Sequence, residues 1–361
     1  MNPFLFRQFR RLETKVHELN YLFWECTQRC NLHCRHCGSD CFASSKDLDM
    51  PLEDFLKALD TIPKPEAGRK SATQRLIVVL TGGEPLLRPD IEQVGRQISK
   101  RGYYWSMVSN GFFYTKDLHV RLMAAGMKAL TFSLDGTEED HNWMRGNPKS
   151  YSRTIEAIRI AALEKRLDMD VVTCVNRRNI NQLEEIYKTL LNLGVRKWRL
   201  FTVIPIGRAK NDPQMHLTNE EMVRLMDFIA EKRRKTDTSG KIRTSSMDVA
   251  FSCEGYLGRY EEKVRPVRFF CHAGINIASV LIDGRICACP NIDRNAFSQG
   301  NIYTDNLYEV WENKFQVFRN RKWAKKGICS RCPQFRNCLG GGMHNWHNGP
   351  LSCHYRRTGN C

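Results

Sequence analysis

Residues 22–37 read LFWECTQRCNLHCRHC, an apolar run that is soon followed by Cys30, Cys34 and Cys37. The apolar run has the length and composition of a buried β-strand, and the C-x3-C-x2-C spacing places three thiols on the loop after it. Three thiolates on one short loop can bind three irons of a [4Fe–4S] cube and leave the fourth iron open. The stretch therefore predicts a strand with a cluster site at its carboxyl end.

The chain has 361 residues and 15 cysteines, and its first 16 residues contain too few apolar side chains to form a secretory signal. We therefore expect a cytoplasmic protein, with no membrane span, whose cysteines bind metal rather than form disulfides. Zinc is the alternative metal for the first three thiols, but a closed zinc site needs four ligands. The spare candidates nearby, which we expect to pack rather than bind, are His33, His36, Cys26 and Cys41.

Short β-rich runs alternate with amphipathic stretches over residues 22–204, which predicts a parallel sheet with helical crossovers. The six predicted strands span residues 22–26, 76–80, 104–108, 128–134, 169–175 and 197–204. Helices are predicted near residues 52–61, 90–101, 116–125, 151–166, 180–192 and 219–234. Six such units predict an α/β fold, a partial (β/α)6 TIM-like barrel that is open along one side.

The composition changes after about residue 239, where turn residues and cysteines become dense and helical periodicity is confined to residues 307–320. This predicts a small, cysteine-rich α+β domain whose thin core depends on metal binding for much of its folding free energy. The predicted organisation is an N-terminal extension (1–20), a core barrel (21–210), a helical linker (211–250) and the cysteine-rich domain (251–361).

Polar and glycine-rich motifs follow successive predicted strands, where the active sites of parallel barrels gather. In chain order they are Thr81-Gly82-Gly83-Glu84-Pro85, Ser109-Asn110-Gly111, Ser133-Leu134-Asp135-Gly136 with His141 and Arg145, Asn176, and Pro205-Ile206-Gly207-Arg208. Together with the three cysteines, this series resembles the radical S-adenosylmethionine (SAM) superfamily.

The resemblance implies that SAM binds the open iron through its amino and carboxylate groups. The reduced cluster then splits SAM into methionine and a 5′-deoxyadenosyl radical. Carried over onto this sequence, the SAM contacts would be Gly82, Gly83, Glu84, Pro85, Ser109, Asn110, Ser133 and Asn176. Asp135 and Arg145 would contact SAM or substrate and are the candidate catalytic residues.

The second set of cysteines resembles the SPASM domain, which binds auxiliary [4Fe–4S] clusters in peptide and protein maturases. The resemblance implies a distal cluster on Cys329, Cys332, Cys338 and Cys353, and a proximal cluster that includes Cys271 and Cys289. The family has another cysteine four residues after Cys338, where this chain has Gly342.

The departure at Gly342 leaves open whether one or two auxiliary clusters are present. The proximal cluster would have an open iron, would use a substitute ligand, or would be absent. Cys287 is the nearest spare thiol and is our candidate ligand, with Cys253 and Cys361 as further spares. We expect Cys174 to pack in the core, and we do not expect His272, His344, His347 or His354 to bind metal.

The leading hypothesis is a radical SAM/SPASM maturase that abstracts hydrogen from a peptide or protein, leading to oxidation, a thioether or a carbon–carbon crosslink. A reductant such as flavodoxin or ferredoxin would supply electrons, and the net charge of +17 would suit an acidic substrate. The alternative within the family is a small-molecule enzyme of cofactor or haem biosynthesis. A zinc module that binds RNA is the alternative of another class, but the basic residues are scattered and nucleic acid is not expected as a partner.

Overall fold

The computed structural model describes residues 2–38, 49–64, 76–234, 247–347 and 349–359. Cys41 and Cys361, two of the spare cysteines, lie outside the described residues. No helix in the described ranges combines the length and the apolarity that crossing a membrane requires.

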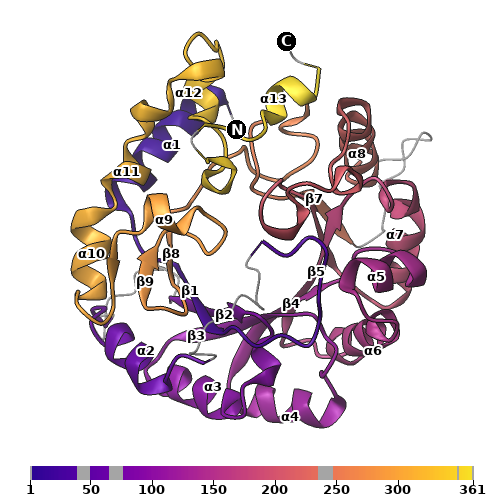
Figure 1. Ribbon diagram of the computed structural model, residues 1–361, viewed down its shortest axis with the longest axis vertical. Coiled ribbons are helices and arrows are strands. Elements are labelled where there is room, and N and C mark those ends of the chain that lie inside the picture. The colour runs from indigo at the N-terminus through magenta and orange to yellow at the C-terminus, as the bar shows by residue number, and fades with distance from the viewer. Residues whose placement is uncertain (1, 39–48, 65–75, 235–246, 348, 360–361) are drawn as a thin grey trace.

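One sheet with the strand order β10-β9-β8-β1-β2-β3-β4-β5-β6-β7 runs through the described residues. Its centre is formed by the six predicted strands: β1 (Tyr21–Thr27), β2 (Ile77–Gly82), β3 (Tyr104–Ser109), β4 (Met127–Ser133), β5 (Asp168–Val175) and β6 (Lys197–Thr202). Each is parallel to its neighbour, and the sheet curves into an open barrel with helices outside (Figure 1). The fold class is therefore confirmed.

The outer helices follow the predicted pattern. They are α2 (Leu52–Leu59), α3 (Ile91–Lys100), α4 (Lys116–Ala124), α6 (Ser150–Ala162), α7 (Leu183–Asn192) and α8 (Asn219–Lys232). Local capping sets several boundaries: Thr218 and Glu221 form a reciprocal capping box at the start of α8. A further helix, α5 (Glu138–Arg145), follows β4 and ends at Gly146, whose φ of 68° is the left-handed conformation that glycine adopts easily.

The C-terminal residues extend the barrel sheet at both edges. At one edge, β7 (Asp248–Phe251) lies parallel to β6. At the other edge, β8 (Ile277–Val280) lies parallel to β1 and is followed by β9 (Arg285–Cys287) and β10 (Gly300–Asn301). We predicted an α+β domain here but placed no individual strand, because segments of two to four residues are too short to show a period. The predicted boundary between the linker and the cysteine-rich domain, at residue 250, falls inside β7. One large hydrophobic core contains residues from Leu22 in the barrel to Met343 in the C-terminal region.

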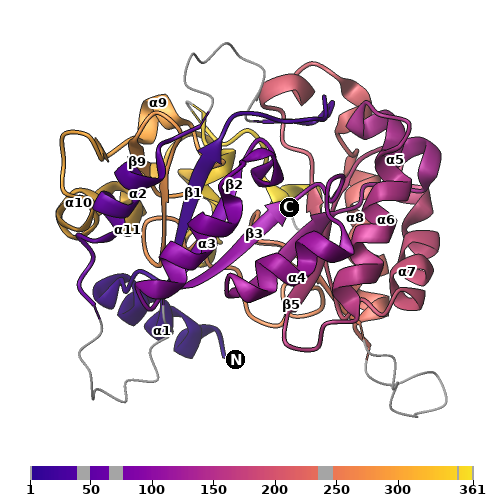
Figure 2. The same cartoon turned by 90° about the horizontal axis from the view of Figure 1, so that it is seen from below.

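The N-terminal extension forms α1 (Pro3–Val16), which packs against the C-terminal region. The Arg10 guanidinium donates hydrogen bonds to the backbone oxygens of Arg336 (2.6 Å) and Asn337 (2.8 Å). In Figure 2, α1 lies on the opposite side of the molecule from α5 and α9. The remaining helices are α9 (Arg294–Phe297), α10 (Leu307–Lys314), α11 (Gln316–Arg319), α12 (Phe335–Cys338) and α13 (His354–Arg357).

Candidate active site

The first three cysteines lie together on the loop that follows β1. Cys34 is buried, while Cys30 and Cys37 are half-buried. Burial raises the pKa of the Cys30 thiol to about 11, and the neighbouring Cys34 and Cys37 contribute to the rise. The loop after β6 closes on the same place, because the backbone N–H of Arg208 donates to the carbonyl oxygen of Cys37 at 3.1 Å. Three adjacent thiols that are buried or half-buried ionise together readily only when a metal centre compensates their charge.

The spacing of these thiols fits a cluster better than a single zinc ion. Sulfur ligands of one tetrahedral zinc lie about 4 Å apart, whereas a cube distributes its ligands over separate irons. In the described part of the chain, one group of three candidate ligand atoms falls within 4.8 Å, and it is His36, Asp135 and Cys174. The negative charge of Asp135 in that group is already paired with Arg145, and burial lowers the pKa of His36.

Asp135 and Arg145 form a buried ion pair beside Cys34. An Arg145 nitrogen lies 3.6 Å from the Cys34 sulfur, and Asp135 accepts the backbone N–H of Cys174 at 2.8 Å. Burial alone would lower the pKa of Arg145, but Asp135, Cys34 and Cys174 together raise it, so the guanidinium stays charged. The pair thus places a fixed positive charge against one predicted cluster ligand. Contacts of Asp135 and Arg145 to SAM or to the substrate stay predictions.

The two glycines after β2 allow two loops to touch. A Cβ at Gly82 would lie 2.2 Å from the carbonyl oxygen of Thr27, and one at Gly83 would lie 2.1 Å from that of Arg29. The backbone N–H groups of Gly83 and Glu84 donate to those same oxygens, both at 2.8 Å. Only glycine permits this approach, which holds the turn after β2 against the chain that leads to Cys30.

Glu84 joins the ends of β2 and β3. Its carboxylate accepts hydrogen bonds from the Ser109 hydroxyl (2.8 Å), the Asn110 backbone N–H (2.7 Å) and the Leu86 backbone N–H (3.1 Å). Burial raises the pKa of Glu84 to about 7, although these hydrogen bonds oppose the shift. Pro85 begins the short 3-10 helix Pro85–Leu87 directly after it. Three residues predicted separately as SAM contacts therefore form one network.

Asn31 is a site residue that the sequence analysis did not single out. Its Oδ1 accepts a hydrogen bond from Asn110 Nδ2 at 2.9 Å, and its own Nδ2 is buried with no hydrogen-bond partner among the described residues. The sequence feature that could have identified it is its position between Cys30 and Cys34, two predicted cluster ligands. An unpartnered amide here is suited to a polar ligand bound beside the triad.

Two other predicted SAM contacts have different surroundings. Ser133 is half-buried at the end of β4. Asn176 is buried, and its side chain shapes the turn after β5: Oδ1 accepts the N–H of Arg178 at 2.9 Å, and Nδ2 donates to the Cys174 carbonyl at 3.2 Å. A role of either residue in SAM binding stays a prediction.

The four predicted distal ligands are brought together in the C-terminal region, where Cys329, Cys338 and Cys353 line one cavity. Burial raises the pKa of Cys338 to about 11, and Cys353 and Cys329 contribute. Burial also raises the pKa of Cys329, with Cys353 and Cys332 contributing. Two come from short helices, Gly327–Cys329 and α12, and Cys353 directly precedes α13. Residues far apart in sequence thus meet as the predicted ligand set requires.

A second group contains Cys253, Cys271, Cys287 and Cys289. Burial raises the pKa of Cys289 to about 12, with Cys253, Cys271 and Cys287 contributing in that order. Cys253 and Cys271 also interact with each other. Burial likewise raises the pKa of Cys287 to about 12, but its other charged neighbours are Arg285, Arg294 and Glu25. Cys253, which we had treated only as a spare, therefore lies near Cys271 and Cys289 and joins them as a candidate proximal ligand.

Comparison with known proteins agrees with this arrangement. Residues 24–190 match the radical SAM superfamily, and residues 271–333 match SPASM, an iron–sulfur cluster-binding domain. AdoMet-dependent heme synthase of Oleidesulfovibrio alaskensis is 25% identical over 92% of this chain and 84% of that protein. Mycofactocin maturase MftC of Mycobacterium tuberculosis is 27% identical over 94% of this chain and 82% of that protein.

Solved structures share the fold. The structure of anSMEcpe with bound AdoMet has a TM-score of 0.68 at 20% identity and covers 94% of both chains. Streptococcus suis SuiB bound to precursor peptide SuiA has a TM-score of 0.69 at 15% identity, and the match covers 98% of this chain and 79% of that one.

The barrel, the thiol triad and the C-terminal cysteine groups define an iron–sulfur enzyme that uses SAM. More particularly, the chain contains a radical SAM domain over residues 24–190 and a SPASM domain over residues 271–333. Its cofactors are [4Fe–4S] clusters and SAM, and its reaction begins with the reductive cleavage of SAM.

Proposed function

We propose that this enzyme abstracts hydrogen from a peptide or protein and that auxiliary clusters accept the electron released as the product forms. The main support is that the C-terminal cysteines form two separate groups, each able to bind one auxiliary cluster. Two such clusters suit a reaction that oxidises its substrate, because they can accept the released electron. The similarity to a maturase over 94% of the chain, and the fold shared with a precursor-peptide complex, support the same class of substrate.

The chain's own residues would prepare the site as follows. Cys30, Cys34 and Cys37 would hold the cluster that, with SAM bound, supplies the 5′-deoxyadenosyl radical. Arg145 keeps a positive charge on the Cys34 side, and Asp135 keeps Arg145 charged and in place. Tight packing and two backbone hydrogen bonds fix the loop after β2 against the loop after β1.

The C-terminal cysteines would bind two auxiliary clusters. Cys329, Cys332, Cys338 and Cys353 would hold the distal cluster within a unit spanning residues 251–361. Cys253, Cys271 and Cys289 would hold the proximal cluster. A flavodoxin or ferredoxin in the cytoplasm would be the electron-transfer partner.

Haem biosynthesis, with a porphyrin as the substrate, is the second candidate function, because AdoMet-dependent heme synthases match nearly as much of the chain at a similar identity. Anaerobic reconstitution with SAM and a reductant, first with peptides encoded beside the gene and then with iron-coproporphyrin, separates the two. We expect a peptide that has lost about two hydrogens. Loss of carboxyl groups from the porphyrin, with every peptide unchanged, would overturn the peptide proposal. The matched control is the triple variant with Cys30, Cys34 and Cys37 changed to Ala.

A further inference from the structure

The imidazole of His344 occupies the space of the cysteine that this chain lacks. A Cβ placed on Gly342 would lie 2.5 Å from Cε1 and 3.0 Å from Nδ1 of His344. Nε2 is bonded to Cε1, so it lies within the volume that a cysteine side chain at position 342 would fill. The histidine ring therefore substitutes sterically for the missing thiol.

The backbone holds this segment against the proximal thiols. The N–H of Met343 donates to the Cys271 sulfur at 3.4 Å, and the N–H of Gly342 donates to the carbonyl oxygen of Glu254, next to Cys253, at 3.0 Å. Gly340 and Gly341 bend the chain into this position with φ values of 85° and 82°. Residues 342–344 thus lie beside the Cys271 thiol and against the residue that follows Cys253.

The Nε2 atom of His344 is buried and has no hydrogen-bond partner among the described residues. Buried polar atoms nearly always have hydrogen-bond partners or ligands, so we expect this nitrogen to bind a ligand. The neighbouring His354 differs, because its Nε2 is paired with the Glu254 carboxylate at 2.9 Å. A buried imidazole nitrogen is also an established type of iron ligand.

We propose that Nε2 of His344 is the fourth protein ligand of the proximal cluster, beside Cys253, Cys271 and Cys289. This inference rests on the proposed function, which assigns those three thiols to a cluster. A neutral imidazole in place of a thiolate makes the site less negative by one charge, which raises the reduction potential.

Pulsed EPR of the reduced holoenzyme, prepared with ¹⁴N- or ¹⁵N-labelled histidine, tests the ligand. We expect one auxiliary signal with a strong, isotope-sensitive nitrogen coupling. In His344→Cys the coupling should disappear and the potential should fall, with the iron content unchanged. His347→Ala is the control, because the Nε2 of this nearby histidine is likewise buried without a hydrogen-bond partner among the described residues. This change should leave the coupling intact. A coupling absent from the parent protein, or retained in His344→Cys, would overturn the proposal. Iron for only two clusters, with the distal signal present, would instead show that the proximal cluster itself is absent.

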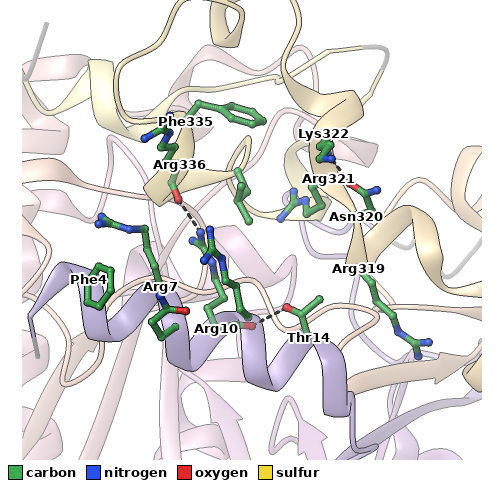
Figure 3. Close-up of a pocket in the computed structure, with 13 residues that line it drawn as sticks. Phe4, Arg7, Arg10, Thr14, Arg319, Asn320, Arg321, Lys322, Phe335 and Arg336 are labelled. Atoms are coloured by element: carbon green, nitrogen blue, oxygen red, sulfur yellow. Dashed lines mark hydrogen bonds between the residues drawn. The ribbon is translucent and has the colours of Figure 1, made fainter.

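A second, independent observation is a basic groove of about 740 Å³ between α1 and the C-terminal region (Figure 3). No acidic side chain lines it among the described residues. Its cations are Arg7, Arg10 and Arg11 from α1, and Arg319, Arg321, Lys322 and Arg336 from the C-terminal region.

The charges in this basic groove repel one another. Burial lowers the pKa of Arg10 to about 10, and Arg321, Arg7 and Arg11 contribute to the shift. Arg321 is only 6% exposed, and its Nε is buried with no hydrogen-bond partner among the described residues. Bound anionic groups would relieve both the repulsion and the unpaired donor.

The basic groove borders the distal thiols. Arg10 donates to the carbonyl oxygens of Arg336 and Asn337, and Cys338 follows directly and interacts with the Arg10 charge. We infer that an acidic one-electron carrier protein docks here. It would take one electron from the reduced distal cluster, which returns to its oxidised state as the carrier is reduced. This inference rests on the proposed distal cluster, and the position beside Cys338 favours a carrier over an acidic peptide substrate.

Binding of purified flavodoxin to the holoenzyme, measured against ionic strength, tests the docking site. We expect the triple variant R7E/R11E/K322E to bind at least tenfold more weakly at low salt, with SAM cleavage by a chemical reductant unchanged. The matched control reverses three exposed charges elsewhere, K149E/R153E/K188E, and should bind flavodoxin normally. Equal binding by both variants would overturn the inference, as would weakened binding of an acidic peptide but not of flavodoxin. Loss of the distal cluster signal in the parent protein would instead contradict the proposed function.

Discussion

Gly83→Ala tests whether the close approach of two loops prepares the SAM site. The new Cβ would lie 2.1 Å from the Arg29 carbonyl oxygen, whereas Cβ contacts under 3.0 Å are essentially never seen. The backbones of the two loops must therefore move apart by about 0.9 Å, because the contacted atom is a backbone oxygen and not the end of a flexible side chain. The two backbone hydrogen bonds that join the loops would weaken, at a cost of about 1–3 kcal/mol in the free energy of unfolding. A displacement near 1 Å at a catalytic site lowers the rate by about 100-fold.

The assay compares SAM cleavage and urea unfolding in Gly83→Ala and in Gly102→Ala. Gly102 has a φ of 85° and nothing within 4 Å of an added Cβ, so its replacement costs backbone strain of about 1–2 kcal/mol without moving the site. We expect both variants to lose stability, but only Gly83→Ala to lose SAM cleavage, with its first cluster still formed. Unchanged SAM cleavage in Gly83→Ala would refute the reasoning.

Three further predictions concern other parts of the molecule. Arg145→Met leaves the Asp135 carboxylate buried and without its ion-pair partner, so the free energy of unfolding should fall by about 3–5 kcal/mol. The double variant with Asp135→Asn should recover much of that loss, as measured by urea titration. Burial lowers the pKa of His141 to about 3, below its unfolded value near 6.5. The unfolded chain therefore binds the extra proton, and this group alone should lower stability by about 1.4 kcal/mol per pH unit between pH 6.5 and its folded pKa. His36 and His344, whose pKa values are also lowered by burial, add to the slope, so His141→Asn should reduce the slope by the share of one group. Cys332→Ser should retain SAM cleavage but yield no modified product by mass spectrometry, whereas loss of both activities would contradict a separate distal cluster.

The central strands and the triad could be predicted because their signals are local. Val78–Leu80 in β2 is a continuous apolar run, as expected of a strand buried on both faces. The spacing of Cys30, Cys34 and Cys37 fixes three ligands on one loop without any tertiary information. Helices α3, α7 and α8 likewise show their apolar faces within one segment.

The remaining features depend on contacts between distant segments. β8 joins the sheet only by pairing with β1, some 250 residues earlier in the chain, and its four residues carry no period of their own. The grouping of Cys253 with Cys271 depends on the path of the chain after β7. The sequence alone does not distinguish His344 from the other histidines near the C-terminal cysteines. Only its contact with Gly342 in the structure shows where its ring lies.

The most direct test of the central claim is EPR of the anaerobically reduced protein, with and without SAM. A cluster held by Cys30, Cys34 and Cys37 should give a [4Fe–4S] signal that changes when SAM is added, and the signal should be missing from the triple alanine variant. A signal that is indifferent to SAM, or that persists in the triple variant, would contradict the account.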